Sequence, residues 1–304
     1  MRHCLSFYLL LGTYQLLGQM TVATVWSSEA ERRSLGAERP AESRAPVFES
    51  RAGLLIVRAR LEGEWANFIL DTGAGELLLN AQLNASSGTE LHSFWGSQRT
   101  APRAVDELHW AGISLRNVTA LQVNMRHLER WLDMPLGGIL GYDLFRQQVL
   151  LLDLGRERML VNPTQLPPAR EWQRLDTRSH LPIVKIKVDG KTLRFGIDSG
   201  ASVNMLDERA KHRLPAAYWQ PSGTRQLSGI EQRATTVPVV TMIGDNALEA
   251  ERFGVADLSA FGADEGIRLD GLLGRPFLDG HVVLLDYARR RVWISDHRPD
   301  QPSK

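Results

Sequence analysis

Residues 63–80 read GEWANFILDTGAGELLLN, and residues 190–207 read GKTLRFGIDSGASVNMLD. Aligned without a gap, at an offset of 127 residues, these stretches place Asp71 opposite Asp198, and each Asp is followed by a hydroxyl residue, a glycine and an alanine. The apolar residues before each Asp are typical of a buried strand that ends at a turn. The chain therefore contains one strand-and-turn unit twice, and this internal repeat decides the interpretation of the fold.

A second repeat lies further along each copy. Residues 137–161 read GGILGYDLFRQQVLLLDLGRERMLV and align without a gap, at an offset of 133 residues, to residues 270–294, which read DGLLGRPFLDGHVVLLDYARRRVWI. The two copies then span residues 46–162 and 181–298, and the proline-containing residues 163–180 are expected to connect them. Identical pairs in this second alignment are Gly138 and Gly271, Leu140 and Leu273, Gly141 and Gly274, Val149 and Val282, Leu151 and Leu284, Leu152 and Leu285, Asp153 and Asp286, Arg156 and Arg289, and Arg158 and Arg291.

The pattern within each copy indicates strands and turns. Short apolar runs alternate with Gly, Asn, Asp and Pro. The expected strands include residues 54–59, 68–70, 77–79, 119–123 and 149–154, and the expected helices are short, at residues 126–132 and 207–212. We therefore predict an all-β fold of two similar lobes, related by a pseudo-two-fold axis, with a few short helices.

The composition of the chain argues against several classes of function. The chain has 304 residues, of which 43% are hydrophobic and 23% charged, and this is typical of a globular protein. The formal net charge of +1 gives no electrostatic basis for binding nucleic acid. The eight histidines lack the spacing of metal ligands, and the single cysteine, Cys4, offers no disulfide. We expect no metal and no cofactor.

The first 28 residues differ from the rest of the chain. After Arg2 and His3, residues 4–28 contain no Asp, Glu, Lys or Arg, and the densest apolar part comes first. Residues 1–28 are typical of an export signal, and an uncleaved membrane anchor is the alternative. Both predict an exported protein, periplasmic or secreted, or anchored to the inner membrane with the lobes outside. Residues 29–45 are expected to be a polar tether or a removable pro-segment, and residues 299–304 a tail.

The repeated aspartates indicate catalysis. A carboxylate directly after a buried strand is costly unless a function uses it. Two such turns facing each other across a two-fold axis would bring Asp71 and Asp198 together, since Gly73 and Gly200 permit tight turns and a close approach. Adjacent carboxyl groups cannot both ionise easily, so they share a proton. The ionised group can activate a water and the protonated group can hydrogen-bond a substrate carbonyl.

This arrangement resembles the aspartic peptidase families, both pepsin-like and retropepsin-like, and most closely the exported bacterial relatives of the retropepsin type. The resemblance covers most of residues 46–298. It implies that Asp71 and Asp198 are catalytic, and that the hydroxyl groups of Thr72 and Ser199 bridge the two lobes. It also implies a peptide or protein substrate, and a monomer that contains an internal pseudo-dimer.

Two further elements are implied by the resemblance. The family's apolar-apolar-Gly element, which braces the catalytic turns, matches residues 139–141 and 272–274. Its flap, a hairpin that covers the substrate, corresponds to Trp95 with Gly96 and to Ser228 with Gly229; the two pairs align at the offset of 133.

The sequence departs from the family pattern at two kinds of position. Gly75 and Glu76 follow the first motif, where the family usually has a polar side chain that holds the substrate backbone, whereas the second motif has Ser202. Ala74 and Ala201 stand where pepsin-like enzymes have a hydroxyl residue. With one hydrogen bond fewer to each carboxylate, the pair should hold its proton to a higher pH, so we expect a mildly acidic optimum.

Two rival functions remain open on the sequence. One is an exported peptide-binding module of the same fold with an inactive or unused pair of aspartates. The other is a structural envelope protein whose repeat is a duplicated β unit. Asp153 and Asp286 also repeat, and we interpret them as structural carboxylates at strand ends that pair with nearby arginines.

Overall fold

The computed structural model describes residues 46–83, 89–93, 96–188, 190–214, 220–227, 230–236, 239–243, 246–251, 253–259 and 266–296. The predicted export segment, the polar segment 29–45 and the tail 299–304 lie outside these ranges, as do Trp95, Ser228 and Gly229 of the predicted flaps. Within the described ranges, no helix is both long enough and apolar enough to cross a membrane.

Strands dominate the structure, so the predicted all-β fold is confirmed. The helices are short, as expected. They are α2 (Arg126–Leu132), α3 (Tyr142–Phe145), α4 (Glu208–Lys211), α5 (Arg275–Gly280) and the 3-10 turns η1 (Leu154–Arg156) and η2 (Ala169–Glu171). Helix α2 has the predicted bounds, and α4 lies within residues 207–212 because Asp207 caps its N-terminus, its side chain accepting a hydrogen bond from the Arg209 amide.

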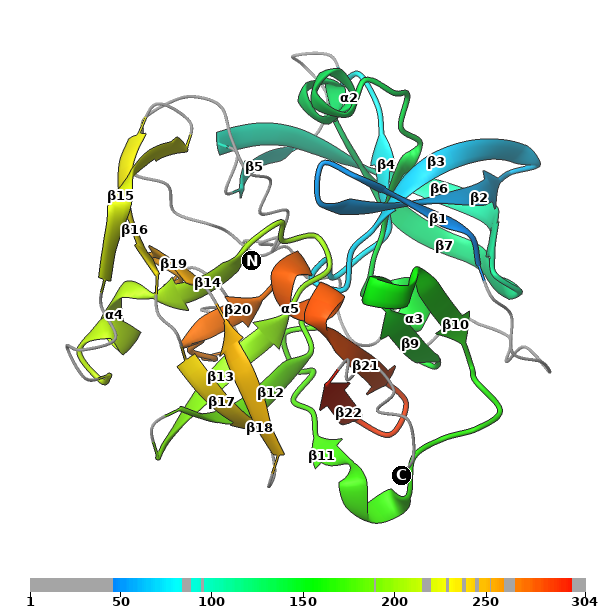
Figure 1. The fold of residues 1–304 in the computed structure, drawn as a ribbon. Helices are drawn as coiled ribbons and strands as arrows, with labels where there is room; N and C mark the ends of the chain where they lie inside the picture. Colours follow the sequence, from blue (N-terminus) through cyan, green and yellow to red (C-terminus); the bar gives the residue numbers. More distant parts are fainter. Residues whose placement is uncertain are drawn as a thin grey trace.

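The first half forms an eight-stranded sheet, at the upper right of Figure 1. The order of its strands is β1-β2-β3-β8-β4-β7-β6-β5. They are β1 (Phe48–Arg51), β2 (Leu54–Leu61), β3 (Glu64–Leu70), β4 (Leu78–Asn80), β5 (Thr89–Ser93), β6 (Gly96–Trp110), β7 (Ile113–Val123) and β8 (Gly138–Leu140). The strands expected at residues 54–59, 68–70, 77–79 and 119–123 fall on β2, β3, β4 and β7, as predicted.

The second half forms a seven-stranded sheet with the order β18-β17-β12-β13-β20-β14-β19. Its strands are β12 (Ile183–Val188), β13 (Lys191–Ile197), β14 (Asn204–Asp207), β17 (Val239–Ile243), β18 (Asn246–Glu251), β19 (Phe253–Ala256) and β20 (Gly271–Leu273). A separate pair, β15 (Gln220–Leu227) and β16 (Ile230–Thr236), forms a two-stranded sheet.

A third sheet joins the two halves. Its order is β10-β9-β21-β22-β11, and its strands are β9 (Val149–Asp153), β10 (Arg158–Val161), β11 (Gln173–Arg174), β21 (His281–Asp286) and β22 (Arg291–Asp296). In the antiparallel pair β9–β21, Leu151 lies opposite Leu284, its equivalent at the offset of 133. In Figure 1 this sheet lies below the first half and to the right of the second, with α5 near their junction. The expected connector contributes β11, which pairs with β22.

The strand before each repeated Asp has the same neighbours in both halves. Strand β3 runs parallel to β8, and β13 runs parallel to β20. Phe68 and Phe195, at equivalent positions on these two strands, are both fully buried. Burying aromatic side chains at this point stabilises the strands that lead into the aspartates and fixes where they end.

The repeated carboxylates at the ends of the third sheet are structural, as predicted. Asp153 pairs with Arg156, with 3.7 Å between the guanidinium and the carboxylate. Asp286, which is fully buried, pairs with Arg289 at 3.4 Å and with Arg291 at 2.8 Å.

Candidate active site

Asp71 and Asp198 occupy equivalent places, each directly after the strand that precedes it. The Asp71 amide donates to the Leu140 carbonyl at 3.0 Å, and the Asp198 amide donates to the Leu273 carbonyl at 2.9 Å. These acceptors lie on β8 and β20, within the apolar-apolar-Gly elements picked out by the sequence. Both aspartates are completely buried. We call residues 71–76 the first loop and residues 198–203 the second loop.

The glycine of each loop lies against the carboxyl group of the other. A Cβ atom placed on Gly73 would lie 2.7 Å from Cγ of Asp198, and one placed on Gly200 would lie 2.6 Å from Cγ of Asp71. Both distances are far shorter than any side chain tolerates, so the close approach requires glycine. The structure thus brings both aspartates and both glycines together at the junction of the halves.

The hydroxyl residues link the loops by reciprocal hydrogen bonds. The Thr72 amide donates to Ser199 Oγ at 3.0 Å, and the Ser199 amide donates to Thr72 Oγ1 at 2.9 Å. Each hydroxyl also donates across the junction: Thr72 to the Ile197 carbonyl at 3.0 Å, and Ser199 to the Leu70 carbonyl at 2.9 Å. These four buried bonds hold the two carboxyl groups in one relative orientation.

The Oδ1 atom of each carboxyl group accepts a hydrogen bond from an amide of its own loop. The amides of Gly73 and Gly200 donate to Oδ1 of Asp71 and Asp198 respectively, both at 2.8 Å. The Oδ2 atoms are buried, and neither has a donor while both groups are ionised. A proton shared by the pair supplies one, because it forms a hydrogen bond between the two carboxyl groups.

Burial dominates the protonation of the pair. It raises the pKa of Asp71 from 3.8 to about 7, although hydrogen bonds from Asp198 and the loop amides act in the opposite direction. The pKa of Asp198 is raised well above its usual range, first by burial and then by the negative charge of Asp71. The two carboxyl groups hydrogen-bond to each other, so they share a proton and titrate as a pair whose pKa values are raised.

An aromatic cluster beside the first loop was missed by the sequence reasoning. The Tyr142 ring lies 4.4 Å from the His180 ring and 5.7 Å from the Tyr287 ring, measured between centroids. Burial, followed by the negative charges of Tyr142, Asp71 and Asp198, raises the pKa of Tyr287 well above its usual range. Tyr142 directly follows the apolar-apolar-Gly element and could have been found from it, whereas His180 lies in the connector and carries no motif.

Of the predicted flap positions, only Gly96 is among the described residues. Gly96 begins β6, which pairs with β5 so that Gly96 faces Ser93. Strands β15 and β16 pair through Leu227 and Ile230. Trp95, Ser228 and Gly229 are outside the described residues, so the flap assignment stays a prediction.

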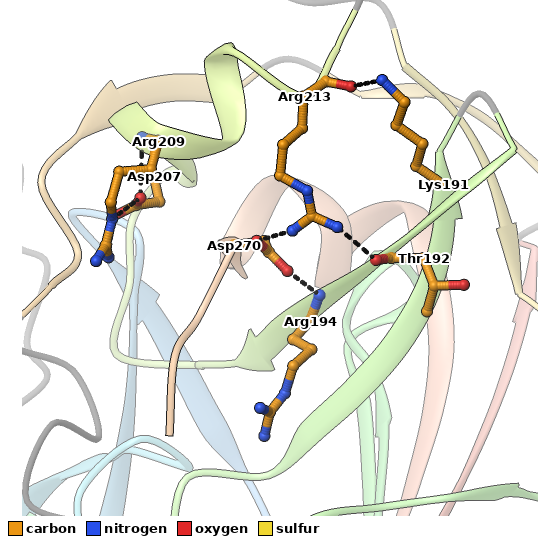
Figure 2. Close-up of polar contacts among 7 residues, drawn as sticks. All are labelled: Lys191, Thr192, Arg194, Asp207, Arg209, Arg213 and Asp270. Atoms are coloured by element: carbon orange, nitrogen blue, oxygen red, sulfur yellow. Dashed lines mark hydrogen bonds and ion pairs between the residues drawn. The ribbon is translucent and has the colours of Figure 1, made fainter. Parts of the chain in front are cut away.

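A network of polar contacts lies beside β13, the strand that precedes the second loop (Figure 2). Asp270, next to β20, accepts a hydrogen bond from the Arg194 amide on β13 at 2.8 Å and pairs with the Arg213 guanidinium. Arg213 also donates to the Thr192 carbonyl at 3.1 Å, and its own carbonyl accepts from the Lys191 ammonium. These contacts fasten the segment after α4 to β13, the strand that leads to Asp198.

The remaining features give no second site of comparable definition. A cavity of about 1090 Å³ lies next to α2, and its lining includes Arg99, His127 and Arg130 but no residue of either loop. Among the described residues, no group of three or more His, Cys, Asp or Glu side chains could hold a metal ion.

Comparison with known proteins points in one direction. Residues 184–277 match the family model of the aspartyl proteases, and the matched segment contains Asp198, the second loop and β20. This match supports a general aspartic protease function. No curated protein matches the chain.

Proposed function

We propose that the chain is an aspartic endopeptidase that hydrolyses peptide bonds with a water activated between Asp71 and Asp198. The observation that carries the proposal is the interlocking of the two loops, in which each carboxyl group lies against the glycine of the opposite loop. That geometry holds two carboxyl groups side by side in a buried place, where their pKa values are raised. A turn that served only the fold would have no need of this costly arrangement.

The proposed reaction has two steps with two proton transfers each, and the second step restores the protons that the first step moved. Ionised Asp71 takes a proton from the water as the water oxygen attacks the peptide carbonyl carbon. Asp198 donates its proton to the carbonyl oxygen, so a neutral gem-diol forms without any covalent bond to the enzyme. Asp71 then gives its proton to the amide nitrogen, the C–N bond breaks, and Asp198 recovers its proton from a diol hydroxyl.

The alternative is a peptide-binding protein of the same fold that does not use the pair for chemistry. The sequence at Gly75 and Glu76 favours it, because the first loop lacks a polar side chain at the position where the second loop has Ser202. Both carboxyl groups are completely buried, and this burial does not distinguish between the two functions.

The proposal is tested by peptide cleavage. The full chain, its Asp71→Asn and Asp198→Asn variants and an Asp106→Asn control are each incubated with a mixed peptide library between about pH 3 and pH 8. Asp106 is exposed and lies on β6. We expect cleavage by the parent and the control, a maximum at mildly acidic pH, and a loss of roughly 100- to 10,000-fold in both loop variants.

Two results would count against the proposal. Cleavage that survives in either loop variant would show that the pair does not perform the reaction. Tight binding of a peptide with a tetrahedral hydroxyl in place of the scissile bond, with no cleavage by any protein, would favour the peptide-binding alternative.

We also propose that the protein acts outside the inner membrane as a monomer, with its N-terminal segment serving as an export signal or an anchor. The uncharged residues 4–28 support this proposal. Cell fractionation of the tagged chain tests it, since cytoplasmic recovery of the intact chain would contradict it. In the same proposal, the hairpins β5–β6 and β15–β16 include the flaps that cover the substrate.

A further inference from the structure

The two loops differ at the first residue of each that is partly exposed. Residues 71–74 and 198–201 are buried, and the next residue of each loop, Gly75 or Ser202, is the first with partial exposure. These two positions are equivalent at the offset of 127. Because four extended residues span at most about 14 Å, a peptide lying across the pair of carboxyl groups comes within reach of both.

Gly75 faces His180 of the connector and Ser202 faces Gly53 of the first half, and the sizes of the facing residues are reversed. A Cβ atom on Gly75 would lie 3.6 Å from Nδ1 of His180, whereas a Cβ atom on Gly53 would lie 3.0 Å from Cβ of Ser202. Gly53 and His180 are themselves equivalent at the offset of 127, and both have left-handed backbone, with φ of +82° and +64°. A large residue therefore faces glycine on one side, and glycine faces a serine on the other.

The imidazole is held in place by an element of the first half. The Tyr142 amide donates to the Ala74 carbonyl at 2.8 Å, so α3 is fixed to the first loop. The Tyr142 ring contacts the ring of His180 at an interplanar angle of 38°, and His180 is partly exposed. His180 keeps this imidazole at a left-handed position where its equivalent is a glycine, and a left-handed backbone disfavours most side chains.

The second loop is contacted by an arginine at the position where the first loop is contacted by Tyr142. Arg275 is equivalent to Tyr142 at the offset of 133, and its amide makes the matching bond to the Ala201 carbonyl at 2.8 Å. Its buried guanidinium pairs with Asp279 and donates to the Gly53 carbonyl at 3.5 Å. The side chain of Arg275 thus ties the Gly53 turn to α5, and the polar group beside the loop is the Ser202 hydroxyl.

We propose that His180 is a substrate-binding residue, which supplies at the end of the first loop the polar contact that Ser202 supplies at the end of the second. Imidazole and hydroxyl groups can both exchange hydrogen bonds with the main-chain amides of an extended peptide. The inference rests on the proposed function in that the peptide lies across Asp71 and Asp198. It implies that one end of the substrate is held by an imidazole and the other by a hydroxyl.

Binding of transition-state mimics tests this inference without requiring turnover. The probes are peptides with a hydroxyethylene group in place of the scissile bond, lengthened on either the N-terminal or the C-terminal side, and their affinities are measured by calorimetry. Lengthening on each side should tighten binding to the parent. In His180→Gly, the increase in affinity that comes from lengthening the probe on one side should fall about 3- to 10-fold. In Ser202→Ala, the increase that comes from lengthening it on the opposite side should fall by a similar factor. Glycine suits the left-handed backbone, so His180→Gly should remain folded.

A double variant distinguishes substrate contact from a general disturbance. Gly75→Ser combined with His180→Gly copies the Ser202 and Gly53 arrangement onto the first side, and should restore most of the lost gain. The inference is overturned if His180→Gly spares both gains, weakens both equally, or affects the same side as Ser202→Ala, and also if the parent binds none of the probes. If the two single variants lose the affinity increase on opposite sides of the probe, but the parent cleaves no peptide, the inference is supported and the proposed peptidase activity is refuted.

Discussion

Replacing Asp71 by asparagine should stabilise the protein at neutral and alkaline pH. The pKa of Asp71 is about 7 in the folded chain and 3.8 in the unfolded chain, because burial disfavours the carboxylate. The folded state therefore binds its proton more tightly, and stability falls as the pH rises from about 4 to about 7. At 1.36 kcal/mol for each pKa unit, the free energy of unfolding decreases by about 4 kcal/mol across this window.

Asparagine removes this pH-dependent loss with little change of shape. Its side-chain oxygen can still accept the hydrogen bond that the Gly73 amide donates at 2.8 Å. We therefore expect Asp71→Asn to be more stable than the parent by about 2–4 kcal/mol at pH 8, with a difference that shrinks towards zero near pH 3. The lower bound allows for the ionisation of Asp198, which remains buried in the variant.

Urea unfolding followed by circular dichroism at several pH values measures the difference, with Asp106→Asn as the control for loss of a single exposed carboxylate. The control should follow the parent at every pH. A variant that is no more stable than the parent at pH 8, or a difference of the same size at both pH extremes, would refute the argument that burial raises the pKa of this carboxyl group.

Three further predictions concern the contacts that position the pair. Gly73→Ala should abolish peptide cleavage and lower the free energy of unfolding by roughly 2–3 kcal/mol in a urea titration, because the added Cβ would lie 2.7 Å from the Asp198 carboxyl carbon. Thr72→Val should cost about 1–3 kcal/mol in the same titration, whereas Thr72→Ser, which keeps the hydroxyl, should cost less than half as much; equal losses would contradict the proposed link between the loops. Asp270→Ala should lower stability by about 2 kcal/mol while retaining cleavage at optimal pH, since it leaves the Arg194 amide without its acceptor but touches neither carboxyl group; loss of activity in the folded variant would show that this network also shapes the site.

Much of the fold could be predicted because its strands are short, apolar and repeated. The runs at residues 54–59 and 149–154 lie on β2 and β9, within a residue or two of the predicted bounds. Helix α2 was predicted from local patterning alone. No strand was predicted in the connector, but Gln173 and Arg174 form β11 against β22. A two-residue strand has no periodicity of its own, so its pairing depends on a partner more than 100 residues away.

The candidate site could likewise be predicted where it depends on a continuous stretch of sequence, but not where it depends on residues far apart in the chain. The motifs at Asp71 and Asp198 are visible in the sequence because each is a contiguous run with a repeated partner. The proximity of His180 to Gly75 is not, since these residues are 105 positions apart and His180 lies outside the repeated stretches. Only the pseudo-two-fold arrangement reveals that Gly53 is the equivalent of His180 and that the two sides of the site differ.

The family match covers residues 184–277, yet the described site takes its parts equally from both halves. The Asp198 carboxyl group lies against Gly73, and the Ser199 hydroxyl donates to the carbonyl of Leu70, so the second loop has its shape only when the first loop is present. Strand β9 likewise pairs with β21 along its whole length. Paired carboxyl groups at this junction therefore depend on association of the halves, and one chain that carries both avoids the translational entropy that two separate subunits would lose on assembly. A single chain also allows the halves to diverge, as Gly75 with His180 and Ser202 with Gly53 have done, which two identical subunits could not do independently.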